Sequence, residues 1–137
     1  MAVKPPSLND ADYAALADFR ATLRSFLAFS EVKAGEVGLS PQQHQALLAI
    51  RGAEQAQATI GYVADRLALK PHSASELVNR LEALSLIERR TAEQDRRRTL
   101  LALTGRAEAM LAELSATHRE EIGRLKPLLL DLLGRFG

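Results

Sequence analysis

Two short runs rich in β-branched and large apolar residues, 87–91 and 99–103, flank a polar stretch that ends in three consecutive arginines. The stretch, AEQDRRR at 92–98, is too polar to be buried. This pattern predicts a β-hairpin with strands 87–91 and 99–103 and a solvent-exposed tip. A single small hairpin in a chain that is helical elsewhere restricts the fold to few classes.

Outside the hairpin, apolar residues recur at three- and four-residue steps, which is typical of amphipathic helices. Aromatic residues make up only 4% of the chain and tryptophan is absent, so Leu, Ala, Ile and Val must form the core. The spacing predicts helices over about 10–33, 41–52, 59–67, 71–84 and 105–137.

Several residues mark the ends of these helices. Ser40 is followed by proline and, at the third helical position, by Gln43, which together predict an N-cap with a capping box. Gly35 and Gly38 are expected to break the first helix. Pro127 is expected to kink or divide the last one.

Composition excludes several classes of protein. The 137 residues fit one domain, and 47% apolar with 26% charged residues is the composition of a folded protein. Cysteine is absent, which excludes disulfides, thiolate metal sites and thiol redox switches. No apolar run approaches the ~18 residues of a membrane span, and the N-terminus lacks the apolar core of a signal peptide. We therefore expect a cytoplasmic protein with no membrane partner.

The helices predicted at 59–67 and 71–84 are separated by only three residues, which makes them a helix-turn-helix candidate. Residues 59–106 contain nine basic and six acidic side chains, whereas the whole chain has a net charge of only +1. The arginine triplet taken alone is equally well explained as a solvated surface. Beside a helix-turn-helix, it is better explained as a contact to DNA phosphates or to the minor groove.

The sequence resembles the MarR family of bacterial winged-helix transcriptional regulators. The resemblance covers most of the chain and is most specific at the wing. It is carried by Leu39-Ser40-Pro41, Thr59-Ile60-Gly61-Tyr62-Val63-Ala64, Leu81-Glu82-Ala83-Leu84, Leu86-Ile87-Glu88-Arg89-Arg90, Asp95-Arg96-Arg97 and Leu103-Thr104. The chain departs from the family at Ser85, where glycine is usual, and at Gly105, which lies closer to the preceding threonine than usual.

The resemblance implies a mainly α fold with a small β-hairpin wing, in which a winged helix-turn-helix is flanked by N- and C-terminal dimerisation helices. We expect a flexible arm at 1–8 and one MarR-type domain at 9–137. Within that domain, the winged helix-turn-helix would span about 39–104, and the dimerisation helices about 9–34 and 105–137.

The sequence also supports a homodimer independently of the resemblance. A helix over 10–33 would be about 36 Å long, at ~1.5 Å per residue. Both it and the last helix carry apolar stripes along their length. A single domain of this size cannot cover both stripes. A monomer with a long helical hairpin is the alternative.

The candidate DNA contacts lie on the second helix of the pair and at the hairpin tip. Short polar side chains near a helix N-terminus suit base edges and phosphates in the major groove, although Ser73 and Ser75 are equally well explained as helix caps. The DNA-binding candidates are Lys70, His72, Ser73, Ser75, Asn79, Arg96, Arg97 and Arg98.

At the hairpin tip, Asp95 is a candidate to orient the arginines by a charge-assisted hydrogen bond. Strand alternation would place Arg96 and Arg98 on one face and Arg97 on the other. The resemblance implies that Arg97 is the minor-groove arginine. Arg89 is expected to pair with an acidic neighbour.

The resulting hypothesis is a sequence-specific DNA-binding transcriptional regulator. It would act as a repressor and a homodimer on a pseudo-palindromic operator, and a small aromatic or anionic ligand would release it. Ligand candidates, chosen by location alone, are Phe26, Phe29, His44 and Arg51. A winged-helix protein-interaction module is the alternative.

No enzyme function is expected, because the sequence contains no GxGxxG, P-loop or GxSxG motif. The three histidines, His44, His72 and His118, are far apart and lack metal-binding spacing. We therefore expect neither a metal nor a cofactor.

Overall fold

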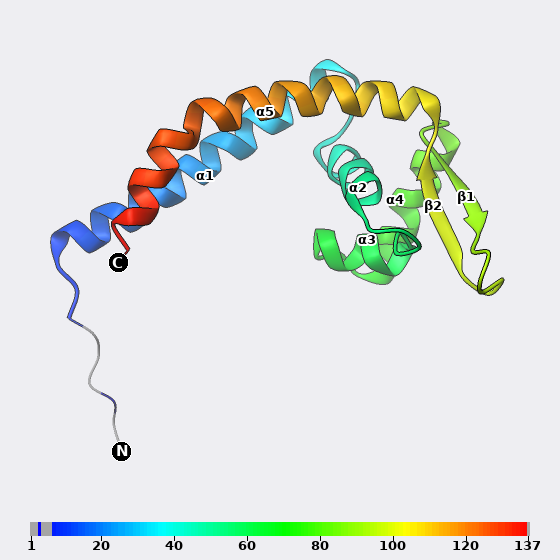
Figure 1. Ribbon diagram of the computed structural model, residues 1–137, viewed down its shortest axis with the longest axis horizontal. Helices are drawn as coiled ribbons and strands as arrows, with labels where there is room; N and C mark the ends of the chain where they lie inside the picture. The colour runs from blue at the N-terminus through cyan, green and yellow to red at the C-terminus, as the bar shows by residue number, and fades with distance from the viewer. Residues whose placement is uncertain (1–2, 4–6, 137) are drawn as a thin grey trace. The chain divides into compact units, whose positions relative to one another are not determined.

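The computed structural model describes residue 3 and residues 7–136 (Figure 1). Most of the arm predicted at 1–8 lies outside these residues. The described part contains α1 (Asp10–Glu36), α2 (Pro41–Gly52), α3 (Ile60–Leu67), α4 (Pro71–Ala83), β1 (Ile87–Thr91), β2 (Thr99–Leu103) and α5 (Gly105–Gly134). The predicted fold class is confirmed, and both strands have the predicted bounds.

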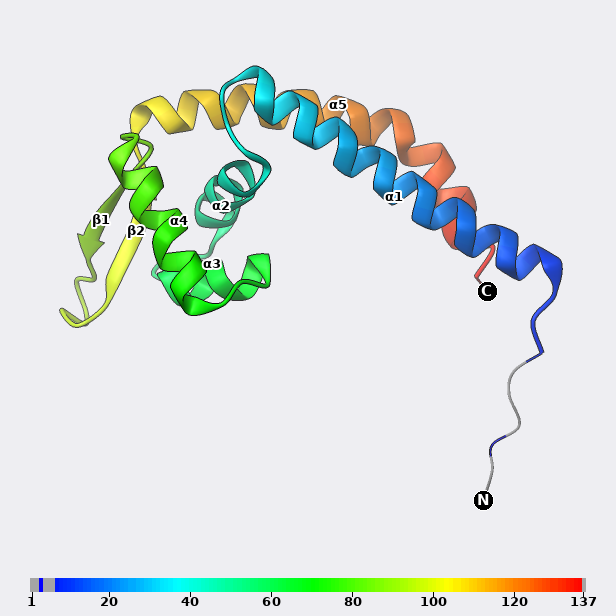
Figure 2. The ribbon, with the colours of Figure 1, turned by 180° about the vertical axis from the view of Figure 1, so that it is seen from behind.

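The chain divides into two compact units. The winged-helix unit is Glu31–Ala116, and it contains α2, α3, α4 and the hairpin. The helical pair is formed by Met1–Ser30 and Thr117–Gly137, so it contains the first part of α1 and the last part of α5. Figures 1 and 2 show these parts of α1 and α5 side by side.

The winged-helix unit has a continuous apolar core. Its largest fully buried side chains include Leu47 of α2, Val63 of α3 and Leu81 of α4. The end of α1 adds Ala34 to this core, and the start of α5 adds Leu111. Because Ile87 and Leu101 of the hairpin also belong to this core, it holds α2, α3 and α4 in fixed positions relative to the hairpin.

The predicted caps fix where α2 and α3 begin. Ser40 Oγ accepts a hydrogen bond from the backbone N–H of Gln43 at 3.1 Å, and Gln43 Oε1 accepts from the backbone N–H of Ser40 at 2.9 Å. This confirms the capping box. Thr59 Oγ1 accepts from the Tyr62 N–H at 3.1 Å and caps α3.

Aromatic and polar contacts join the two helices of the helical pair. His118 Nε2 lies 2.8 Å from Ser30 Oγ. The rings of Phe26 and Phe29 meet the imidazole edge-on, with centroids 5.9 and 5.5 Å away. Phe26 and Phe29, which were predicted as ligand contacts, thus take part in a specific contact between α1 and α5.

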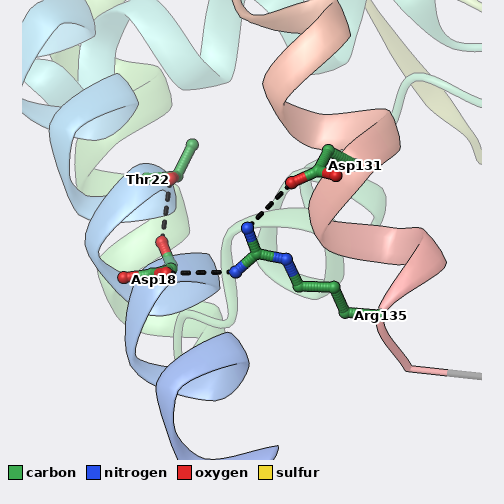
Figure 3. A network of polar contacts seen from close by, with 4 residues as sticks. All are labelled: Asp18, Thr22, Asp131 and Arg135. Atoms are coloured by element: carbon green, nitrogen blue, oxygen red, sulfur yellow. Dashed lines mark hydrogen bonds and ion pairs between the residues drawn. The ribbon is translucent and has the colours of Figure 1, made fainter. Parts of the chain in front are cut away.

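Arg135, which follows the last residue of α5, links the two helices (Figure 3). Its guanidinium lies 3.3 Å from Asp18 Oδ2 of α1 and 2.9 Å from Asp131 Oδ2 of α5. Thr22 Oγ1 donates to the Asp18 carbonyl at 2.8 Å, so the hydroxyl bonds to the backbone of the same turn.

The prediction for Gly35 is wrong, and of the kink or division predicted at Pro127 the division is wrong. Gly35 does not break α1, which continues to Glu36; the chain turns at Gly38, where φ is +84°. Ala34, which is fully buried, holds this last turn against the core, and that packing outweighs the poor helix propensity of glycine. Pro127 does not divide α5, which is continuous to Gly134.

Candidate nucleic-acid interface

A tight turn joins α3 to α4. Ala68 adopts the left-handed conformation, with φ at 54°, and its N–H bonds back to the carbonyls of Ala64 and Asp65. The Leu69 N–H also bonds to the Ala64 carbonyl, at 2.9 Å. The chain therefore reverses within three residues, as the helix-turn-helix prediction requires.

The end of α4 explains how the chain tolerates its departure from the usual glycine. Ser85 has φ at 60°, a left-handed conformation that costs a non-glycine residue about 1–2 kcal/mol. The Ser85 and Leu86 N–H groups still bond to the carbonyls of Glu82 and Leu81, both at 3.0 Å. The geometry that glycine would provide is thus present with serine, and it leads directly into β1.

The polar candidates on α4 lie away from its buried side. Ala74, Val78 and Leu81 are fully buried. Lys70 is the N-cap residue and makes no side-chain cap bond. Its side chain is exposed, and Ser75 is partly buried. The exposed polar residues of α4 are His72, Ser73, Glu76, Asn79, Arg80 and Glu82.

The proposed capping role of the two serines gains no support. Lys70, not either serine, is the N-cap of α4. Among the described residues, neither the Ser73 nor the Ser75 hydroxyl has a hydrogen-bond partner within the chain. Both hydroxyls remain available to a ligand of this surface.

Two of the other α4 candidates are held by neighbours. His72 Nε2 lies 3.1 Å from Glu76 Oε1 one turn later. Asn79 Oδ1 accepts from Arg89 Nη2 at 2.5 Å, and Arg89 Nε also donates to Glu82 at 3.3 Å. Arg89 pairs with an acidic neighbour as predicted, and it fixes the orientation of the Asn79 amide.

Sequence reasoning missed a groove beside α4. It has a volume of about 690 Å³, and its lining includes Ser40 and Gln42 at the start of α2 with Ser73 and Arg80 of α4. Arg80 follows Ser73 by seven residues, or two helical turns, so helical periodicity was sufficient to find it. The participation of α2 depends on tertiary packing and has no local signal.

The wing is the hairpin β1–β2, paired from Ile87↔Leu103 to Thr91↔Thr99. Bonds from the Ala92 N–H to the Arg98 carbonyl and from the Arg98 N–H to the Asp95 carbonyl, both 3.0 Å, close its tip. The arginines precede β2, so the predicted strand alternation is wrong for them: they occupy the tip turn, where the chain has no two-residue period.

The three arginines have different environments. Asp95 Oδ1 accepts from the Arg97 N–H at 3.0 Å and from Arg97 Nε at 3.4 Å, as predicted, yet the Arg97 side chain is 93% exposed. Arg96 is exposed and has no partner among the described residues. Arg98 Nη2 instead donates to the Ala56 carbonyl at 2.9 Å.

The four ligand candidates are divided between the two units. Phe26 and Phe29 belong to the helical pair, where they contact His118. His44 and Arg51 belong to the winged-helix unit: His44 is buried, and Arg51 Nε forms an ion pair with Glu108 at 3.0 Å. The ligand site stays a prediction.

The fold and the arrangement of α3, α4 and the hairpin define a winged helix-turn-helix protein. A model of the MarR family matches residues 37–98, from the end of α1 to the wing tip. Over these residues the chain is similar to the MarR family. A search of curated proteins found no match.

Solved structures share this fold. MepR, a transcription regulator of the Staphylococcus aureus multidrug efflux pump MepA, aligns with a TM-score of 0.72 and 20% identity over 91% of this chain and 98% of MepR. A MepR–DNA complex aligns with a TM-score of 0.65 and 20% identity, and the alignment covers 87% of this chain and 94% of the MepR chain. RV1404 from Mycobacterium tuberculosis aligns with a TM-score of 0.69 and 23% identity, and the alignment covers 89% of this chain and 82% of RV1404.

The part of the chain that the structure describes contains neither a membrane-spanning helix nor a cluster of metal ligands. None of the helices there is long and apolar enough to cross a membrane. In the same part of the chain, no group of three His, Asp or Glu side chains is placed to hold a metal ion.

Proposed function

We propose that this protein is a sequence-specific DNA-binding transcription regulator that acts as a homodimer on a pseudo-palindromic operator. One observation carries the proposal: a single compact unit presents both the exposed polar side of α4 and a wing tip with exposed arginines. A helix with short polar side chains fits the major groove. The function would place the protein in the cytoplasm.

Each element has a distinct proposed role. Ser73 and Ser75, whose hydroxyls are without internal partners, would contact base edges, with His72 and Asn79 beside them. Lys70 would contact a phosphate. Arg97 would enter the minor groove, where a guanidinium gains from the negative potential of a narrow groove and needs little base identity.

The proposed regulator is a repressor that a small aromatic or anionic ligand releases from DNA. The match of residues 37–98 to a model of the MarR family supports this mode of action, and MepR, which has the same fold, is a transcription regulator of an efflux pump. Phe26, Phe29, His44 and Arg51 are the proposed ligand contacts.

A gel shift with DNA from upstream of the protein's own gene, alongside random DNA, tests DNA binding directly. Arg97→Ala is expected to weaken binding to both DNAs alike and to lower the slope of log K against log salt by about one. Arg124→Ala is a matched control, since it removes one exposed charge from the helical pair. An Arg97→Ala protein with normal affinity and slope would contradict the wing assignment.

The alternative, a winged-helix module that binds another protein, predicts an acidic wing. The three arginines at 96–98 argue against it. Failure of the unaltered protein to bind either upstream or random DNA at low salt would favour this alternative.

A further inference from the structure

The three consecutive arginines of the wing tip are equivalent in the sequence but not in the structure. Arg96 is exposed without a partner in the described chain, and Arg97 contacts only the nearby Asp95. Arg98 reaches a residue 42 positions earlier, Ala56, whose backbone carbonyl accepts from Nη2 at 2.9 Å. Only this third guanidinium joins the tip to a different part of the fold.

The acceptor lies in the loop between α2 and α3, and that loop has a defined shape. Ala56 adopts a left-handed conformation with φ at 65°. The Gln57 N–H bonds to the Glu54 carbonyl at 3.1 Å, and the Thr59 N–H bonds to the Gln57 carbonyl at 2.8 Å. The loop thus presents its Ala56 carbonyl from a folded turn rather than from an extended chain.

The same loop contacts the hairpin at a second point. The Leu101 N–H of β2 donates to the Ala58 carbonyl at 2.7 Å. One bond therefore fixes the strand and the other, from Arg98, fixes the tip. A bond with a charged donor is stronger than a neutral one, which suits an anchor at an exposed position.

We propose that Arg98 is a positioning residue of the wing: it anchors the tip to the α2–α3 loop and holds Arg97 ready for DNA, rather than contacting DNA itself. The inference rests on the proposed DNA-binding function. An anchored tip loses less conformational freedom on binding than a mobile one, so the anchor strengthens binding without adding a contact. Its loss is expected to weaken binding about three- to tenfold.

The proposal separates two roles that a single affinity measurement would confuse. An arginine that neutralises a phosphate contributes about one unit to the salt slope, because it releases a counterion. A positioning arginine changes affinity at every salt concentration and leaves the slope nearly unchanged. Arg98→Ala should therefore lower affinity with the slope preserved, whereas Arg97→Ala should lower both.

Hydrogen exchange of the full chain without DNA gives a readout that does not depend on operator binding. In Arg98→Ala, the Ala92 amide, which bonds to the Arg98 carbonyl at the tip, should exchange about tenfold faster or more. Arg96→Ala is the matched control, because it removes a neighbouring arginine that has no partner; its Ala92 exchange should equal that of the unaltered protein.

Two results would overturn the proposal: unchanged Ala92 exchange in Arg98→Ala, or a salt slope that falls by about one in that variant. Arg98→Lys, which keeps a cationic donor, should recover part of the protection if the anchor is the cause. If the unaltered protein binds no DNA, the proposed function fails, whereas the exchange measurement still decides whether Arg98 anchors the tip.

Discussion

The winged-helix unit and the helical pair differ in how well each covers its own apolar side chains. In the winged-helix unit, Leu47 and Leu81 are completely buried. In the helical pair, many large apolar residues are between 44% and 60% exposed: Leu8, Tyr13, Leu16, Leu23, Leu27, Ile122, Leu128, Leu130, Leu133 and Phe136. Most of these exposed side chains come from α1 and α5; Leu8 precedes α1, and Phe136 follows α5.

This difference shows that only one of the two units buries most of its large apolar side chains within itself. The winged-helix unit forms a complete core from its own residues. The helical pair has apolar surface left over after its two helices have packed, and extended apolar patches on protein surfaces mark interaction sites. A second copy of the chain, with the same stripes, is the partner that the proposed homodimer supplies.

Removal of the helical pair should have the largest effect. A fragment of residues 31–116 keeps Ala34 and Leu111 in the core, so it should fold as a monomer. Without a linked second half-site, its operator affinity should fall by about 10²–10⁴. Sedimentation and gel shifts of the fragment and the full chain measure both effects. A dimeric fragment would show that the helical pair is not the dimer interface.

Leu81→Ala tests the other side of the comparison. Because Leu81 is fully buried, its truncation should lower the free energy of unfolding by about 2–5 kcal/mol. Leu48→Ala is a matched control in the same unit: this side chain is 49% exposed, and the change should stay within about 0.5 kcal/mol. Denaturant unfolding at one protein concentration provides the comparison, and equal losses would mean that the core is not where the buried residues indicate.

The sequence predicted the local elements of the winged-helix unit well, because their signals are local. The hairpin followed from two apolar strands around a polar tip, and the start of α2 followed from Ser40 and Gln43. Gly35 was misjudged because local propensity cannot register the tertiary packing of Ala34, which keeps the helix continuous.

The candidate site was less predictable. The sequence identified the polar residues of α4 and the arginines of the wing, and the family resemblance singled out Arg97, but nothing in the sequence indicated a separate contact for Arg98. The contact from Arg98 to Ala56 depends on a loop 42 residues away, and the groove beside Arg80 depends on the position of α2. Both require the folded arrangement of separate elements.

A charge placed among the exposed apolar side chains of the helical pair should have a smaller effect, which falls on the dimer dissociation constant. Leu27 is 57% exposed, so Leu27→Glu should leave the core of the winged-helix unit intact while it weakens the dimer. A buried unpaired carboxylate at an interface should raise the dimer dissociation constant at least tenfold, or about 1.4 kcal/mol. Sedimentation over a range of concentrations measures this constant. Leu48→Glu, outside the helical pair, is the control, and equal weakening by both variants would contradict the assignment of the interface.

The smallest effect is expected at the ion-pair network of the helical pair (Figure 3). Arg135 is 46% exposed, and its partners Asp18 and Asp131 are 59% and 60% exposed. Solvent screens charges at such positions, so Arg135→Ala should cost only about 0–1 kcal/mol, and less at high salt. Thermal unfolding at low and high salt measures the loss.

Arg124→Ala is the matched control for that experiment, because Arg124 pairs with Glu121 on its own helix and does not join α5 to α1. A difference between the two variants isolates the contribution of the link between the helices. A salt-independent loss of about 3–5 kcal/mol in Arg135→Ala is the range for breaking a buried ion pair. That result would show that the network is buried in the working protein, and that apolar packing alone does not hold the ends of α1 and α5 together.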